Sequence, residues 1–479
     1  MHQWDWLAEG GQTFAPGQYT ALVTSLEVDL AVIGFGKGGK TLAGALGRRG
    51  WRVVMIEQSP LMYGGTCINI GCVPTKSMVF RSEHLDAATA HPDRYREAIT
   101  ATAQLTASLR DINYAALDRI ETVTVLTGHA SFTDSHVLNV KTIDGQSITV
   151  TAQWIVVGTG SRPVLPPIPG LADAPAVYTS TDLLGEAALP RRLTVLGGGY
   201  VGVEFAAMYA AYGSQVCILD RGPRVLSRED DDVADCARDI LIGRGIDMVT
   251  SAAVSAVSAN AGGGSTVSYR VDGVTRTVDT DAILVALGRE PVTDGLDLDA
   301  AGVETTAAGA IVVDDHLRSS QPHIFAVGDV NGGPQFTYIS LDDYRVVLSQ
   351  LAGDGSRSTA TRMAVPYALF MTPPLARVGL TEKAARETHD VKVATMRVAE
   401  MATMPRARIV GEDAGLMKVV VDADSDTILG AALLSYDSHE VINTVALAIR
   451  HGITATELRD SIYTHPSMTE GFNGLLAAL

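Results

Sequence analysis

The stretch LAVIGFGKGGKTLAGALGRRGWRVVMIEQ, residues 30–58, aligns without a gap with LTVLGGGYVGVEFAAMYAAYGSQVCILDR, residues 193–221. Each copy opens with an apolar, β-branched run that is typical of a buried parallel strand. A G-x-G-x-x-G motif, an Ala-rich helical stretch and a second apolar strand that ends in an acidic residue follow in the same order. The repeat therefore predicts two strand–turn–helix–strand units within an α/β fold.

The glycines of the two motifs have distinct physical tasks. The first makes a tight turn, the second lets the backbone approach a pyrophosphate, and the third lets helix and strand pack closely. The helix N-terminus then faces the phosphates. In each copy an acid lies 23 residues beyond the first glycine (57 − 34 and 220 − 197), where its carboxylate can accept a hydrogen bond from a ribose 2′-OH. Two such units predict two Rossmann-like dinucleotide-binding domains, with these residues at the sites: Gly34, Gly36, Gly39 and Glu57 in the first, Gly197, Gly199, Gly202 and Asp220 in the second.

Two dinucleotide sites in one chain indicate electron transfer between two cofactors. Asp220 favours NADH over NADPH at the second site, because a carboxylate there would repel a 2′-phosphate. Arg221 and Arg224 follow closely and could accommodate that phosphate, so NADPH stays an alternative.

Composition narrows the class of protein. The 479 residues suggest about three domains at ~150 residues each. A net charge of −17 opposes binding to nucleic acids and anionic membranes. The sequence has no apolar run near the ~18 residues of a membrane helix, and its N-terminus does not resemble a secretory signal. With only four cysteines, the chain is expected to be a cytoplasmic protein without a disulfide scaffold.

Two of the cysteines, Cys67 and Cys72, lie in GGTCINIGCVPTK, residues 64–76. On an ideal helix they would stand ~7.5 Å apart along the axis, whereas disulfide Cα–Cα distances usually stop near ~6.8 Å. A bridge therefore requires the backbone to leave helical geometry, which Gly71 makes easier. The spacing suits a redox pair, but two unrelated core residues or a regulatory switch are also compatible with it. Half of a zinc site is disfavoured, because Cys217 and Cys236 form no matching C-x-x-C.

GGTCINIGCVPTK resembles the active-site motif of the class I pyridine nucleotide–disulfide oxidoreductases, which bind FAD and NAD(P)H. The resemblance starts near Val28 and covers nearly all of the remaining chain. Further segments that match the family are VVGTGSRP (156–163), ALGREP (286–291), IFAVGDV (324–330), FMTPPLARVGLTE (370–382) and THPSMTE (464–470).

The resemblance implies a role for each catalytic residue. Cys72 would be the charge-transfer thiolate beside the flavin, and Cys67 the thiol that meets the acceptor. His465, oriented by Glu470, would act as general acid/base from the partner subunit of a homodimer. Lys76 would sit near flavin N5 and pair with Glu204. The implied FAD contacts are Gly34, Gly36, Gly39, Glu57, Lys76, Ala130, Gly160 and Asp329, and the implied NAD contacts are Gly197, Gly199, Gly202, Glu204, Asp220 and Gly288.

The family architecture implies two Rossmann-like domains and a C-terminal α+β dimerisation domain. We expect FAD-binding segments at 28–165 and 289–360, an NAD(P)-binding domain at 166–288 and a dimerisation domain at 361–479. Residues 1–27 lie outside the resemblance as an N-terminal extension without an assigned function. Local patterns predict helix over most of 84–120, a loop at 259–267, a hairpin over 415–435 and a helix over 438–452 that ends at Gly452.

Three segments (34–43, 64–76 and 332–345) are similar to a subgroup, the bacterial reactive-chlorine-resistance flavoproteins, which resemble NADH-dependent Cu(II) reductases. The chain has no cysteine after Cys236, whereas a mercuric reductase is expected to end in a vicinal pair. Thr75 also differs from the residue usual in dihydrolipoamide dehydrogenases and glutathione reductases. We therefore expect an FAD enzyme that passes electrons from NAD(P)H through Cys67 and Cys72 to Cu(II) or another soft metal, which the two thiolates would ligate transiently. The alternatives are a disulfide reductase of the dihydrolipoamide dehydrogenase or glutathione reductase type, and a redox sensor or complex subunit with little turnover.

Overall fold

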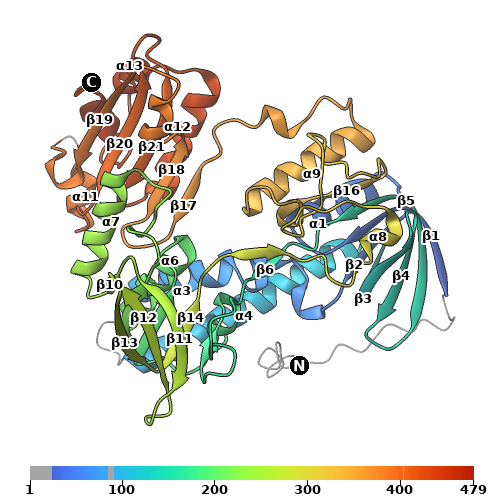
Figure 1. Cartoon of the computed structure of the whole chain (residues 1–479). Helices are drawn as coiled ribbons and strands as arrows, with labels where there is room; N and C mark the ends of the chain where they lie inside the picture. Colours follow the sequence, from blue (N-terminus) through green and yellow to red (C-terminus); the bar gives the residue numbers. More distant parts are fainter. Residues whose placement is uncertain (1–23, 85–90, 403) are drawn as a thin grey trace.

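The computed structural model describes residues 24–84, 91–402 and 404–479, so most of the expected 1–27 extension lies outside the described residues. Figure 1 shows three sheet-based parts, with the C-terminal part above the second part of the chain. Within the described ranges, none of the helices combines the length and apolarity that a membrane crossing requires.

The first sheet carries the first half of the repeat. Its core is parallel, in the order β3-β2-β1-β5-β16, and β4 joins β3 to β5 in an antiparallel meander. Helices α1 and α9 pack together on one face, where Leu42 and Val346 share an apolar cluster with Val32. The elements of this part are β1 (Ser25–Ile33), α1 (Lys37–Gly47), β2 (Val53–Glu57), β3 (Val123–Asp134), β4 (Val137–Thr142), β5 (Ser147–Val157), α8 (Leu298–Ala301), β16 (Ile324–Ala326) and α9 (Thr337–Ala352).

The second sheet carries the other half of the repeat and is parallel throughout, in the order β10-β9-β8-β14-β7. Its elements are β7 (Val177–Tyr178), α5 (Ser180–Leu183), β8 (Arg192–Leu196), α6 (Tyr200–Ala211), β9 (Gln215–Leu219), α7 (Asp231–Gly243), β10 (Asp247–Val249) and β14 (Ala282–Val285). An antiparallel three-stranded sheet is attached, formed by β11 (Ala253–Ala259), β12 (Ser265–Val271) and β13 (Val274–Thr280). The loop expected at 259–267 is therefore shorter, because both of its ends belong to strands.

The chain leaves the first sheet and returns to it along two short paired strands. β6 (Ser161–Pro163) runs antiparallel to β15 (Arg289–Pro291), with Ser161 opposite Pro291. This pairing brings 156–163 and 286–291, two of the segments quoted above, to one place beside the first sheet.

The C-terminal part is an antiparallel sheet in the order β17-β18-β21-β20-β19. The predicted hairpin is formed by β20 and β21, and the predicted helix α12 ends at Gly452, whose φ is +65°. The elements are β17 (Tyr367–Leu369), β18 (Leu375–Gly379), α10 (Glu382–Arg386), β19 (Val391–Arg397), α11 (Pro405–Ile409), β20 (Leu416–Asp422), β21 (Ile428–Leu434), α12 (Ser438–His451), α13 (Ala455–Asp460) and α14 (Gly471–Leu476).

Three helices follow β2 and carry the cysteine segment between the two sheets. They are α2 (Thr66–Asn69), α3 (Cys72–His84) and α4 (His91–Asp118). The prediction of helix over most of 84–120 is confirmed for the described residues. Helix α3 also contacts α6 of the second part, so the cysteine segment lies against both halves of the repeat.

Candidate active site

The first glycine motif forms the turn between β1 and α1. Gly34 has a φ of +98°, and a Cβ there would lie 2.3 Å from the carbonyl oxygen of Gly158. A Cβ on Gly39 would lie 2.8 Å from Val32 Cγ1, so only glycine allows this approach of helix to strand. Helix α1 begins after Gly36, which has no side chain to cap it. The Gly38 N–H donates to Ser340 Oγ at 3.0 Å, so an anion at this helix end would meet the amides of Gly36 and Lys37, which line the cavity.

Glu57 closes β2 beside this turn. Its carboxylate accepts the backbone N–H of Phe35 at 2.9 Å and that of Ser59 at 3.3 Å. Burial raises the pKa of Glu57 to about 7, although the amide hydrogen bonds act in the opposite direction. The side chain is thus fixed at the strand end, where an acceptor for a ribose hydroxyl is required.

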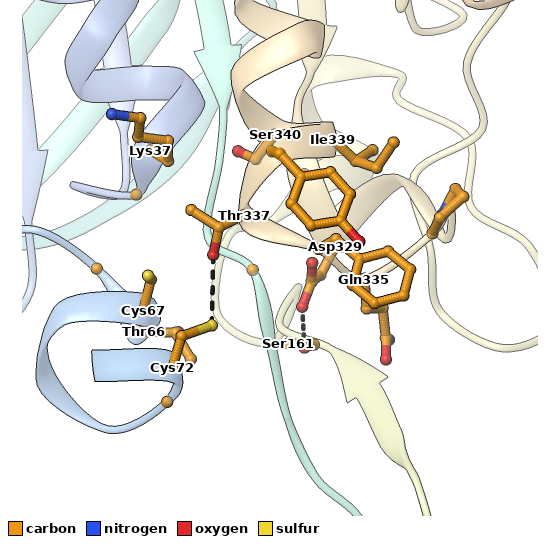
Figure 2. A pocket seen from close by; sticks show the side chains of 18 of the residues that line it. Lys37, Thr66, Cys67, Cys72, Ser161, Asp329, Gln335, Thr337, Ile339 and Ser340 are labelled. Atoms are coloured by element: carbon orange, nitrogen blue, oxygen red, sulfur yellow. Dashed lines mark hydrogen bonds between the residues drawn. The ribbon is translucent and has the colours of Figure 1, made fainter. Parts of the chain in front are cut away.

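A cavity of about 2520 Å³ extends from this turn to the cysteine segment and on to α6. Gly160 and Gly288 have φ values of +76° and +122°, and a Cβ at either would enter open space rather than packed protein. Asp329 Oδ2 accepts a hydrogen bond from Ser161 Oγ at 2.5 Å, and this pair faces the same space (Figure 2). An open cavity with both polar and apolar walls that begins at a helix N-terminus fits a dinucleotide such as FAD. The predicted residues that line it are Gly34, Gly36, Glu57, Cys67, Cys72, Lys76, Ala130, Gly160, Glu204, Gly288 and Asp329.

The backbone leaves helical geometry between the two cysteines, as a bridge between them would require. Helix α2 ends at Asn69, Ile70 has a φ of −142°, and α3 starts at Cys72. Both residues are thiols in this structure, and Cys72 is exposed toward the cavity. Figure 2 shows the pair facing Thr337, whose Oγ1 lies 3.7 Å from Cys72 Sγ.

The two thiols differ in acidity. A hydrogen bond from Cys67 lowers the pKa of Cys72 to about 6; burial opposes the shift, while the charge of Lys76 and a hydrogen bond with Thr337 add to it. The pKa of Cys67 is raised for the complementary reasons, first by its hydrogen bond to Cys72 and then by burial. Cys72 is therefore the thiolate of the pair near neutral pH.

Lys76 and Glu204 form the contact that the family resemblance implies. Lys76 Nζ lies 2.6 Å from Glu204 Oε1 and 4.8 Å from the centre of the Phe370 ring. Glu204 Oε2 accepts the backbone N–H of Phe370 at 3.2 Å. Since Lys76 is on α3, Glu204 on α6 and Phe370 follows β17, this cluster joins all three parts of the chain beside Cys72.

The second glycine motif has the same geometry as the first, at the entrance of α6 outside the cavity. Gly197 has a φ of +108°, and a Cβ on Gly202 would lie 1.9 Å from the Gly197 carbonyl oxygen. Helix α6 begins after Gly199 without a side-chain cap. Asp220 accepts the backbone N–H groups of Gly198 at 2.5 Å and Gly222 at 2.6 Å, which fixes its carboxylate beside the motif.

The two arginines after Asp220 are not equivalent. Arg221 is exposed, whereas the Arg224 guanidinium pairs with Asp235 of α7 at 2.8 and 3.0 Å and lies 3.2 Å from Asp231. Arg224 is thus directed toward two carboxylates of its own domain.

His465 and Glu470 form a pair of their own. Nδ1 of His465 lies 2.8 Å from Glu470 Oε2, and the His465 side chain is 69% exposed. Neither residue lines the cavity that holds the cysteines. Within one chain the structure therefore does not bring His465 to Cys67 and Cys72.

Some residues at the site were not singled out by the sequence. Thr337 lies within 332–345 but carries no motif of its own, and it meets Cys72 only through the tertiary fold. Lys40, on α1, donates from Nζ to the Gly64 carbonyl at 3.2 Å and to Asn113 Oδ1 at 2.5 Å. Burial lowers the pKa of Lys40 to about 8, and its charge acts on Cys67. Lys40 lies within the segment 34–43, but no local pattern marks it as a partner of the cysteine segment.

Two models of known protein families together match almost the whole described chain. Residues 28–343 match the model of the pyridine nucleotide-disulphide oxidoreductases, and residues 365–475 match the dimerisation domain of the same enzymes. The chain belongs to this family. It is accordingly an oxidoreductase that uses FAD and NAD(P)H, and its dimerisation domain supports a homodimer.

Relatives of this oxidoreductase include several kinds of reductase. It is 45% identical over 447 residues to "Probable pyridine nucleotide-disulfide oxidoreductase RclA" of Escherichia coli strain K12, covering 93% of this chain and 98% of that protein. A mercuric reductase of Staphylococcus aureus is 32% identical (95% and 82% covered), and a dihydrolipoyl dehydrogenase of Geobacillus stearothermophilus is 30% identical (93% and 95% covered). A solved structure described as a Cu(II) complex of the HOCl-induced flavoprotein disulfide reductase RclA from Escherichia coli superposes with a TM-score of 0.88 at 44% identity, covering 95% of this chain and 100% of that one.

Proposed function

We propose that this enzyme passes electrons from NADH to Cu(II), or to another soft metal ion, through Cys67 and Cys72. The observation that carries the proposal is the placement of Cys67 and Cys72 in one cavity with the Lys76–Glu204 pair, next to the first glycine motif; the charge of Lys76 helps to lower the pKa of Cys72. The relative RclA, which is HOCl-induced and has been solved as a Cu(II) complex, supports a metal acceptor and a role in reactive-chlorine stress.

FAD, when bound along the first glycine motif with Glu57 and Asp329, supplies the two-electron chemistry that links NADH to the disulfide. Lys76, held by Glu204, keeps a positive charge beside Cys72 and stabilises its thiolate. Cys67 is the thiol that the acceptor meets. His465, held by Glu470 and supplied by the second subunit, manages the proton of Cys67.

Cu(II) suits this dithiol on chemical grounds. Two soft thiolates favour Cu(I), so binding by Cys67 and Cys72 promotes the reduction of Cu(II). One NADH yields two electrons, which reduce two Cu(II) to two Cu(I) and release NAD⁺ and one proton. In the half-reaction at the cysteines, the dithiol returns to the disulfide and releases two protons.

The proposal also covers the domain boundaries, the pyridine nucleotide that donates the electrons and the cellular compartment. The FAD-binding segments are 28–165 and 289–360, the NAD-binding domain is 166–288, and the dimerisation domain is 361–479. NADH is the preferred donor, because Asp220 is fixed by two amides and Arg224 is paired with Asp235. We assign the enzyme to the cytoplasm, where the reducing environment suits a dithiol pair that cycles rather than a structural disulfide.

The test is anaerobic NADH oxidation with Cu(II), in which a chelator traps Cu(I) as it forms. The unmodified enzyme should produce Cu(I) rapidly, Cys72→Ala should lose this activity while retaining FAD, and Cys217→Ala, a cysteine outside the cavity, should retain it. Equal Cu(I) formation by Cys72→Ala and the unmodified enzyme would refute the relay and indicate leakage from free flavin.

Reduction of a disulfide is the second candidate, because a dihydrolipoyl dehydrogenase matches over 93% of this chain. Rapid turnover with lipoamide or glutathione disulfide, and slow turnover with Cu(II), would select it. Negligible turnover with every acceptor despite full FAD occupancy would indicate a redox sensor or a complex subunit.

A further inference from the structure

Three side chains from distant segments meet beside the second glycine motif. Tyr200 is the first residue of α6 and directly follows Gly199. Its hydroxyl lies 2.9 Å from Glu229 Oε1, and the hydroxyl of Tyr367 lies 2.8 Å from the same oxygen. The two hydroxyls are 3.1 Å apart. Since Tyr367 belongs to β17, the C-terminal sheet reaches the entrance of α6.

Glu229 is held rigidly at the centre of this cluster. Its second oxygen accepts a hydrogen bond from Arg377 Nε at 2.6 Å, and the side chains of Glu229 and Arg377 are 0% and 3% exposed. Burial raises the pKa of both Tyr200 and Tyr367, so both phenols stay protonated and donate to the carboxylate. A buried carboxylate with a guanidinium on one oxygen and two phenols on the other has little freedom to move.

The aromatic rings of the cluster form part of the cavity wall. Tyr200 and Tyr367 both line the cavity, with ring centres 5.5 Å apart. Tyr367 in turn stacks on Phe336 at 6.0 Å with an interplanar angle of 11°. Phe336 precedes Thr337, the residue beside Cys72. A continuous wall therefore runs from the second glycine motif toward the cysteine pair.

We propose that Tyr367 is a positioning residue of the pyridine-nucleotide site. Together with Glu229 it holds the Tyr200 ring where the nicotinamide end of NADH enters the cavity. The nucleotide then meets a ring whose orientation is already fixed, so less conformational entropy is lost on binding. This inference rests on the assignment of the second glycine motif to NADH in the proposed function.

Tyr367→Phe in the FAD-loaded enzyme tests the inference with the loss of a single oxygen. Calorimetric titration with NAD⁺ measures affinity without turnover or an acceptor, and anaerobic stopped-flow reduction by NADH separates the dissociation constant from the limiting rate. We expect NAD⁺ and NADH to bind about fivefold more weakly, because the lost hydrogen bond to Glu229 does not touch the nucleotide and only part of its free energy reaches the binding equilibrium. The FAD content should not change.

Tyr178→Phe is the matched control, because the Tyr178 hydroxyl also bonds a carboxylate of this domain, Glu186 Oε2 at 2.9 Å, but lies outside the cavity. It should leave NAD⁺ affinity unchanged. Tyr200→Phe combined with Tyr367→Phe should weaken binding no more than the larger single effect, because both hydroxyls act through Glu229.

Unchanged or tighter NAD⁺ binding by Tyr367→Phe would overturn the positioning role, and so would fully additive effects in the double variant. None of these measurements involves Cu(II), so failure of the metal-reductase proposal would leave them unaffected. Absence of NAD⁺ binding by the unmodified enzyme would overturn the NADH assignment and this inference with it.

Discussion

We predict that the choice between NADH and NADPH depends on Asp220 and on the ion pair between Arg224 and Asp235. Arg224 is close enough to Asp220 in sequence to reach a 2′-phosphate, but Asp235 holds its guanidinium through two hydrogen bonds. We predict that Asp220→Ser combined with Asp235→Ala will raise the kcat/KM for NADPH relative to NADH. The first change removes the carboxylate that repels the phosphate, and the second removes the two hydrogen bonds that hold the arginine, which leaves it only the exposed carboxylate of Asp231 at 3.2 Å.

The size of the effect follows from the two interactions exchanged. The Arg224–Asp235 pair is about one-third exposed on both sides, so breaking it costs only about 0–1 kcal/mol. A new charge-assisted hydrogen bond from arginine to phosphate contributes about 1.5–3 kcal/mol. The net gain of about 0.5–3 kcal/mol corresponds to roughly 2- to 140-fold in the NADPH/NADH ratio, at about 1.4 kcal/mol per factor of ten.

The assay compares kcat/KM for the two nucleotides under anaerobic conditions with one acceptor. Asp239→Ala is the matched control, since Asp239 pairs with Arg238 on the same helix and does not contact Arg224. This control should keep the wild-type ratio. A wild-type enzyme that prefers NADPH, or a double variant with an unchanged ratio, would refute the reasoning.

Two further predictions concern the thiolate and the first glycine turn. Because the pKa of Cys72 is lowered to about 6, its thiolate should persist above that pH and be lost as the pH falls below it. Alkylation of Cys72 across pH measures the midpoint, which Lys76→Met should raise. An unmoved midpoint in this variant would contradict the role of the Lys76 charge. Gly34→Ala should destabilise the protein more than Gly50→Ala and should reduce FAD loading. Both glycines have similar positive φ values, but a Cβ on Gly34 would lie 2.3 Å from the Gly158 oxygen, whereas a Cβ on Gly50 would enter open space. Equal losses of melting temperature in the two variants would show that φ alone sets the cost, at about 1 kcal/mol.

Local patterns in the sequence determined the repeated unit and much of the candidate site. The glycine spacing predicted both turns, because a tight turn and a close helix–strand contact are set by residues near one another in the chain. Gly34 and Gly197 accordingly adopt the positive φ that the motif requires. The break between Cys67 and Cys72 was predictable for the same reason, since five residues of helix cannot bring two sulfurs into bonding distance.

The tertiary structure decided which distant side chains act on those local units. Sequence left Arg224 available for a phosphate, and the fold turned it toward Asp235 on the next helix. Thr337 meets Cys72 across 265 residues of sequence, and Tyr367 reaches Tyr200 across 167. Such contacts depend on how the three sheet-based parts of the chain pack, and no local spacing encodes the orientation of one part against another. The pattern of glycines and cysteines thus determines that the chain can bind dinucleotides and carry a dithiol pair. The packing of its sheet-based parts determines which charged groups and hydroxyls contact these sites.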